Sequence, residues 1–213
     1  MVQKTSVETK PAKGRPRRFD AEVVLGQVRD TFWRHGFAGT SMDQISAATG
    51  LHKPSLYGAF CDKKQLFMEI LSRYRAEARE QIGAALAKPA ILDSIAEMLE
   101  SAIVMYTRPG SQGGCFTMNV AAPVAASDPE VTAFVRDSME ALDRGVTRRF
   151  ERAVADGELA ALADPAALAR IVITSQYELS MRARAGYSAA ELRPLAAKTL
   201  ETVRMAAGIA SGS

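Results

Sequence analysis

The chain has 213 residues, of which 47% are hydrophobic, and this is enough apolar material to bury a core. No run of about 18 apolar residues occurs and the N-terminus lacks the apolar stretch of a signal peptide, so we expect a cytoplasmic protein without a membrane partner. Cys61 and Cys115 lie 54 positions apart, outside any CxxC or Cys/His cluster, which argues against a disulfide framework or a metal site.

The net charge is only +3, but the positive charge is concentrated near the N-terminus. Residues 1–18 contain six basic side chains and a single acid, Glu8, without the apolar periodicity of a helix. Two interpretations remain open from charge alone: a solvated tail, or a surface that binds a polyanion such as a nucleic acid.

The first helix is predicted from Asp20, a suitable N-cap, to His35, with Gly36 in the left-handed conformation that ends a helix. Ser41-x-x-Gln44 then has the pattern of a capping box. It predicts a second, short helix that ends before Gly50. The residues expected on its buried side are Met42, Ile45 and Ala48.

A third helix of about two turns is predicted after Gly50, because Pro54 is tolerated in a first turn, where N–H groups have no intrahelical acceptor. Leu56 and Phe60, four residues apart, are expected to face inward. Asp62 is a suitable cap for a long amphipathic helix. Further breaks between Lys88 and Gly186 predict five more helices, and strand-like alternation is missing, so the sequence indicates an all-α class.

Two very short helices separated by a glycine-containing turn are typical of a helix-turn-helix, in which the first helix supports the second in the major groove of DNA. Isolated helices of this length are marginal in water, so each must be held by its neighbours. Only the N-terminal side chains of the second helix need to reach base edges.

The stretch TSMDQISAATGLHKPSLYGAFCDKKQLF, residues 40–67, resembles the DNA-binding signature of TetR-family transcriptional regulators. The resemblance implies an all-helical homodimer of about nine helices that binds a palindromic double-stranded DNA operator and a small-molecule inducer of unknown identity, with no cofactor. The implied domains are a basic arm at 1–18, a helix-turn-helix domain at 19–62, and a ligand-binding and dimerisation domain at 63–213.

The resemblance also implies which residues contact DNA. A hydroxyl at a helix N-terminus suits a phosphate, and we expect the N-terminal residues of the second helix both to cap it and to bind phosphate. An arginine arm suits the negative potential of the minor groove. The expected DNA-binding residues are Arg15, Arg17, Arg18, Thr40, Ser41, His52, Lys53, Pro54, Ser55, Tyr57 and Lys64. His52 and Cys61 depart from the commoner family residues, so the operator sequence is not transferable.

The part of the chain after residue 90 is rich in Ala and Met and has polar residues within apolar stretches, as ligand pockets do. Each of these residues taken alone is as well explained by core packing. The candidate ligand-binding set is Met98, Met105, Cys115, Phe116, Met118, Asn119, Phe134, Gln176, Tyr177 and Met181.

The segment GGCFTMN, residues 113–119, is the most distinctive part of this region. Its glycines allow a sharp turn into a helix, which places Cys115 near a positive dipole end that lowers a thiol pKa. The segment also resembles one found in a branch of the family that includes sensors of electrophiles and oxidants. A redox or electrophile sensor is therefore one alternative, and a buried, inert thiol is the other.

The last two helices, predicted at about 165–183 and 188–208, carry apolar stripes. In the family, the matching pair forms a four-helix interface with a two-fold mate, although one stripe does not reveal whether its partner is the same chain. The expected interface residues are Leu168, Val172, Leu192, Leu195, Leu200 and Val203.

Three functions follow from the sequence. The main prediction is a ligand-released repressor rather than an enzyme. An enzyme using Cys115 with His35 or His52 as the base is disfavoured, because both histidines belong to the DNA-binding third and no cofactor motif occurs. An architectural DNA-binding protein without an effector needs less than the roughly 130 C-terminal residues present, since domains begin at about 50 residues.

Overall fold

The computed structural model describes residues 21–208, and within that range it contains nine α-helices, one short π-helix and no strand. The predicted all-α class is therefore confirmed. The helices are α1 (Ala21–Gly39), α2 (Met42–Thr49), α3 (Lys53–Phe60), α4 (Lys63–Leu86), α5 (Ile91–Tyr106), α6 (Ala122–Ala125), α7 (Pro129–Ala155), α8 (Pro165–Arg184) and α9 (Ala189–Ala206). The π-helix, η1, spans Thr117–Ala121. No helix in the described part combines the length and the apolar content needed to cross a bilayer.

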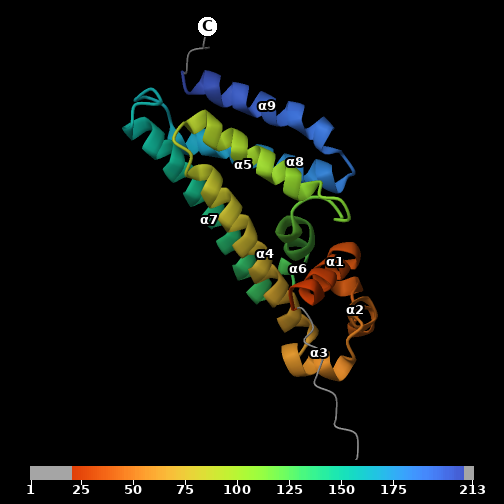
Figure 1. The fold of residues 1–213 in the computed structure, drawn as a ribbon. Coiled ribbons are helices and arrows are strands. Elements are labelled where there is room, and N and C mark those ends of the chain that lie inside the picture. Colours follow the sequence, from red (N-terminus) through yellow and green to blue (C-terminus); the bar gives the residue numbers. More distant parts are fainter. Residues whose placement is uncertain (1–20, 209–213) are drawn as a thin grey trace, which may run out of the picture.

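Helices α1 to α3 lie together at one end of the molecule, and α5, α8 and α9 pack together at the other (Figure 1). Helices α4 and α7 run side by side between the two ends. With 24 residues, α4 is about 36 Å long at 1.5 Å per residue. It therefore joins the two ends of the molecule as one continuous element.

The second helix ends as predicted, whereas the first helix does not end at Gly36 in the left-handed conformation. Gly36 has φ 70° and ψ 172°, a conformation open to glycine, and it kinks α1 before the last residues, which continue to Gly39. The capping box of α2 is confirmed: Ser41 Oγ accepts from Gln44 N at 3.2 Å, and Gln44 Oε1 accepts from Ser41 N at 2.7 Å. Gly50 ends α2 in the left-handed conformation.

The third helix is as short as predicted, and Pro54 lies in its first turn. Leu56 is fully buried, and Phe60 packs against the core while remaining partly exposed. On the second helix, Met42 and Ile45 are buried, but the prediction for Ala48 was wrong. Ala48 is exposed, because the buried stripe of an eight-residue helix covers fewer positions than the sequence period allows.

The N-terminal helices are held on α4 by an aromatic cluster. The ring of Phe32 meets that of Phe67 edge-on at 5.1 Å, and Trp33 meets Tyr74 and Phe116 at 5.8 and 5.3 Å. Such contacts add about 0.5–1.5 kcal/mol each to the burial of the rings. Because Trp33 is on α1 and Phe116 precedes η1, this cluster joins the N-terminal helices directly to the C-terminal part of the fold.

Candidate functional site

The solvent-facing side of α3 carries the residues predicted to read DNA. His52, Lys53, Pro54 and Ser55 are all exposed, and Tyr57 is 46% exposed. His52 is the N-cap residue, but its side chain makes no capping hydrogen bond. The His52 imidazole therefore does not cap α3 and remains exposed to solvent.

Thr40 and Ser41 have different environments, although both were predicted to contact phosphate. Thr40 is 2% exposed, and its hydroxyl donates to Gly36 O at 2.7 Å. The prediction that Thr40 offers a hydroxyl to phosphate is therefore not met, because that hydroxyl closes the turn after the Gly36 kink. Ser41 is exposed at the N-terminus of α2, so of the two residues only Ser41 keeps the environment that the predicted phosphate contact requires.

The two lysines predicted to contact DNA are both paired with carboxylates. Lys53 Nζ lies 2.5 Å from Asp43 Oδ1 on α2. Lys64 Nζ lies 2.9 Å from both Asp128 Oδ2 and Glu130 Oε2 at the start of α7. Hydrogen bonds to Glu130 and Asp128 raise the pKa of Lys64, and the bond to Asp43 raises that of Lys53, so both amines stay protonated. A phosphate contact by either lysine would therefore compete with the carboxylates that already hold it.

Lys63 has a structural role that the sequence did not reveal. Its ammonium donates to Phe37 O at 3.0 Å and Thr40 O at 2.9 Å and lies 4.4 Å from the centre of the Phe37 ring. It thus fixes the turn between α1 and α2 onto the start of α4. The sequence alone does not show that Lys63 is the lysine bonded to the turn and Lys64 the one that faces the surface.

The arginine arm is not described. Arg15, Arg17 and Arg18 lie outside residues 21–208, as does the proposed cap Asp20. Their contact with DNA stays a prediction.

Five of the predicted ligand residues belong to one polar cluster in the C-terminal helices. Cys115 N and Asn119 Nδ2 donate to the buried hydroxyl of Ser180 on α8, at 2.8 and 3.4 Å. Gln176 Nε2 donates to Tyr106 Oη at 3.2 Å, while Gln176 Oε1 and the Tyr177 hydroxyl are buried without a partner in the described part. Met105 Sδ accepts from the Tyr74 hydroxyl at 3.3 Å. The five are Met105, Cys115, Asn119, Gln176 and Tyr177.

The thiol of Cys115 does not have the reactive environment expected at a helix start. Part of the residue is exposed, but burial of the thiol raises its pKa, despite opposing hydrogen bonds from the Met118 backbone and the Tyr74 hydroxyl. The prediction of a lowered thiol pKa was wrong, because desolvation of the Cys115 thiol outweighs the effect of the dipole of the following π-helix η1. His35 and His52 are exposed on the N-terminal helices, so neither shares the environment of this thiol.

The other predicted ligand residues are dispersed. Met98 and Phe116 are fully buried in the core, Met118 is partly exposed, and Phe134 packs against the Arg75 guanidinium at 4.1 Å. Met181 is 62% exposed on the outer face of α8 and does not line the interior, contrary to its assignment to a pocket. Helical periodicity in the sequence predicted which positions are apolar, but it did not show which of them the fold buries.

Gly113 lies at a junction that the sequence also did not predict. Its carbonyl accepts from Trp33 Nε1 at 3.2 Å, and Arg184 at the end of α8 donates to Gln112 O and Trp33 O at 2.9 and 3.4 Å. The loop between α5 and η1 is thereby bound both to the first helix and to α8. No signal in the sequence relates these residues, which are up to 151 positions apart.

Four of the six predicted interface residues are covered within the chain. Leu168, Val172, Leu192 and Val203 are at most 3% exposed, whereas Leu195 and Leu200 are partly exposed. For the four, the structure supports intrachain packing between α5, α8 and α9. In the described part, no group of three or more His, Cys, Asp or Glu side chains is placed to hold a metal ion.

Comparisons with known proteins agree with this arrangement. Residues 27–70 match the model of bacterial regulatory proteins of the tetR family, and residues 92–197 match that of the tetracyclin repressor-like C-terminal domain. The chain is 26% identical to the HTH-type transcriptional repressor ComR of Escherichia coli (strain K12), over 90% of this chain and 92% of that protein.

Two solved structures are similar over nearly their whole length. A chain from Rhodococcus sp. RHA1 described as a TetR transcriptional regulator is 34% identical, with a TM-score of 0.60, over 85% of this chain and 98% of that one. A cysteine mutant of the regulator CifR, in complex with a 26-bp operator DNA, is 28% identical with a TM-score of 0.75, over 88% of this chain and 98% of that one.

Proposed function

Because the chain belongs to the TetR family of transcriptional regulators, we propose that it is a repressor that binds a palindromic operator as a homodimer and is released by a small molecule. The observation that carries the proposal is the exposed N-terminal half of α3, held from behind by the fully buried Leu56. A helix anchored in this way presents its first two turns to a major groove. The operator-bound CifR and the repressor ComR support the assignment of the activity.

The contacts divide by chemistry. Lys53, Ser55 and Tyr57 are assigned to base edges and adjacent phosphates, with His52 and Pro54 beside them at the helix start. Ser41 and Lys64 are assigned to phosphate, together with Arg15, Arg17 and Arg18 of the arm. The corresponding domains are the arm at 1–18, the DNA-binding helices at 19–62, and the effector and dimerisation part at 63–213.

The dimer is proposed to form through the outer faces of α8 and α9. The exposed apolar side chains there include Met181 and Met205, which are 62% and 64% exposed, with Leu195 and Leu200 partly exposed beside them. Exposed apolar side chains on adjacent helices suit an interface with a two-fold mate. A two-fold axis would present two copies of α3 to the two halves of a palindrome.

Tyr57→Ala tests the role of α3, with Tyr187→Ala as a matched control, because Tyr187 is 40% exposed but lies in the turn between α8 and α9. The operator is first recovered by in vitro selection with the purified protein, and affinities are then measured by fluorescence anisotropy. A base contact is worth about 1–3 kcal/mol, so Tyr57→Ala should bind the operator roughly 5- to 150-fold more weakly and prefer it less over random DNA. Equal affinities for the two variants would show that α3 does not read the operator.

A further inference from the structure

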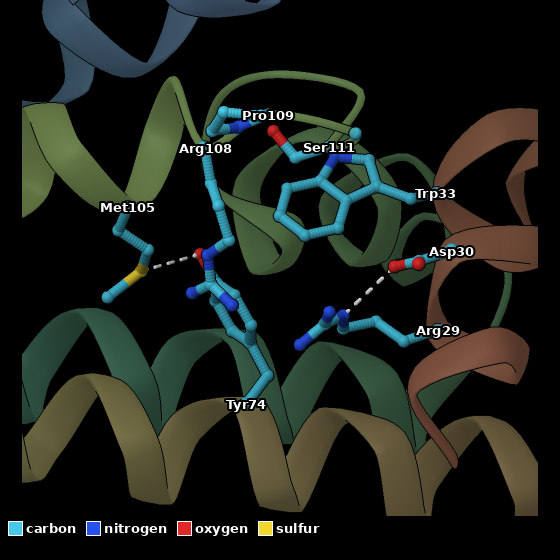
Figure 2. A pocket seen from close by; sticks show the side chains of 9 residues that line it. Arg29, Asp30, Trp33, Tyr74, Met105, Arg108, Pro109 and Ser111 are labelled. Atoms are coloured by element: carbon cyan, nitrogen blue, oxygen red, sulfur yellow. Dashed lines mark hydrogen bonds and ion pairs between the residues drawn. The ribbon is translucent and has the colours of Figure 1, made fainter. Parts of the chain in front are cut away.

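A pocket lies between the DNA-binding helices and the C-terminal part, and it shares Tyr74 and Met105 with the polar cluster around Cys115. It encloses about 100 Å³ and is lined by α1, by Tyr74 of α4, by Met105 of α5 and by residues 108–111 of the loop that follows. From α1 it takes Arg29, Asp30 and Trp33. Figure 2 shows the Arg29 and Arg108 side chains reaching from opposite sides into the space beneath the Trp33 ring.

Arg29 has unused hydrogen-bonding capacity in this pocket. Its side chain is 24% exposed, and its Nε donates to Asp30 Oδ1 at 3.3 Å. Among the described residues, its two terminal nitrogens have no hydrogen bond or ion pair. A guanidinium carries five N–H donors, so this partly exposed arginine can bind an anion without giving up a hydrogen bond from its terminal nitrogens.

Arg108 supplies a second cation on the opposite side. Its Nη2 lies 3.2 Å from Glu77 Oε1, and its side chain is 46% exposed. Exposed ion pairs of this kind are weak, so the guanidinium can turn toward a ligand with its remaining donors. Asp30 and Glu77 each occupy only part of one guanidinium, which leaves the pocket with two donor groups for a single anion.

Trp33, Tyr74 and Met105 form the apolar part of the pocket wall, because their polar atoms are already bonded to each other or to the loop. The Trp33 indole N–H donates to Gly113 O, and the Tyr74 hydroxyl donates to Met105 Sδ. The Trp33 and Tyr74 rings stand edge-on at 5.8 Å and 88°. The pocket thus combines a cationic end with an aromatic and thioether wall.

We propose that this pocket binds a small carboxylate, held between Arg29 and Arg108 with its apolar part against Trp33, Tyr74 and Met105. Two guanidinium groups match the planar geometry of a carboxylate. The cavity is smaller than the roughly 150 Å³ that accepts benzene, which limits the ligand to about four to six non-hydrogen atoms. The proposal rests on the proposed function, because it assigns the small molecule that releases the repressor to this pocket.

The position of the pocket explains how such a ligand would act on DNA binding. Arg29 belongs to α1, while Arg108 belongs to the loop that also carries Gly113. A carboxylate that draws the two arginines together changes the position of α1 relative to this loop. The DNA-binding helices move with α1, so the ligand favours one arrangement of the two ends of the molecule.

Trp33 provides a direct assay, because it is the single tryptophan of the chain and lines the pocket. The full-length protein is titrated with sodium propionate to about 50 mM, since so small a ligand is expected to bind no more tightly than about millimolar. Propionamide, the uncharged analogue of the same shape, and sodium chloride at equal ionic strength are the controls. A saturable change in tryptophan fluorescence with propionate, and none with the controls, is the expected result.

Three variants locate the binding. Arg29→Gln and Arg108→Gln should each weaken propionate binding at least tenfold, since each removes a charge-assisted hydrogen bond to the ligand. Arg144→Gln, at a 60% exposed arginine on α7, should leave it unchanged. Unchanged binding in both pocket variants, or equal responses to propionate and propionamide, would overturn the assignment.

Operator affinity measured with and without propionate separates this inference from the proposed function. A decrease in affinity that is lost in Arg29→Gln supports both. Propionate binding without any change in operator affinity overturns the assignment of the releasing ligand to this pocket. If propionate does not bind while a ligand from a melting screen releases the operator, the pocket proposal fails and the repressor proposal stands.

Discussion

Replacing Gly113 by alanine tests whether the loop after α5 is held against α8 as closely as the structure shows. Gly113 has φ +76°, and a Cβ added there would lie 2.3 Å from Ala183 O and 2.9 Å from Ala183 C. Both are backbone atoms of a helix, so they cannot turn away as the end of a flexible side chain can. Gly157 is a matched control, because its φ is +75° and nothing lies within 4 Å of its added Cβ.

The cost of each substitution follows from these contacts. Alanine in the left-handed region costs roughly 1–2 kcal/mol, which is the whole cost expected for Gly157→Ala. Gly113→Ala adds an overpacking cost of about 1–3 kcal/mol, for a total of about 2–5 kcal/mol. In a chain of this size each kcal/mol lowers Tm by about 2–4 °C, so the two variants should differ by about 2–12 °C.

Thermal unfolding followed by circular dichroism measures the difference, at the same protomer concentration for every variant because any dimerisation would make Tm depend on concentration. Gly113→Ala should also weaken operator binding, since the Gly113 carbonyl is the acceptor for Trp33 on α1. Equal decreases in Tm for Gly113→Ala and Gly157→Ala would show that the loop is free to move away from α8, and the reasoning would fail.

Two further predictions concern charged and titratable groups. Glu130→Gln removes one of the two carboxylates that hold Lys64, so it should tighten operator binding and steepen its salt dependence. The control Glu140→Gln, on the same helix, should change neither. An unchanged operator affinity of Glu130→Gln would exclude Lys64 as a phosphate contact. Because burial raises the pKa of Cys115, its thiolate fraction near neutral pH lies below that of a free thiol and increases only as the pH rises. Iodoacetamide should therefore modify the exposed Cys61 first, as measured by peptide mass spectrometry. Faster labelling of Cys115 at pH 7 would favour the electrophile-sensor alternative.

Local signals in the sequence were enough to predict most helix boundaries. The capping pair Ser41 and Gln44, the turn at Gly50, Pro54 in a first turn and the Asp62 cap each act within four residues of themselves. Such interactions are encoded by neighbouring positions, so a single sequence reveals them. The short length of α2 and α3 then indicated the helix-turn-helix.

Contacts between distant residues were not predictable in the same way. Lys64 matched a DNA-contact position, yet nothing near it in the sequence indicates Asp128 and Glu130 as its partners. Leu168 and Val203 were correctly predicted to lie in the apolar stripes of the last two helices, but a helical period does not tell whether a stripe meets its own chain or a mate. The pocket proposed to bind a carboxylate was missed for the same reason, because Arg29 and Arg108 come to line one pocket only through the packing of α1 and α5 against α4.

The proposed release of the operator does not require a signal to pass through the hydrophobic core. The Gly113 loop, which Trp33 and Arg184 bind to α1 and to α8, is already a direct link between the DNA-binding end and the helices proposed to form the dimer. A rotation of α1 against this loop alters the separation of the two α3 helices in a dimer, and that separation must match the half-site spacing of the operator. A ligand that prefers the DNA-free arrangement by about 100-fold supplies about 2.7 kcal/mol of coupling, which lowers operator affinity by the same factor. The pocket between Arg29 and Arg108 lies where such a preference can arise, since its two cationic sides belong to the two elements that would move.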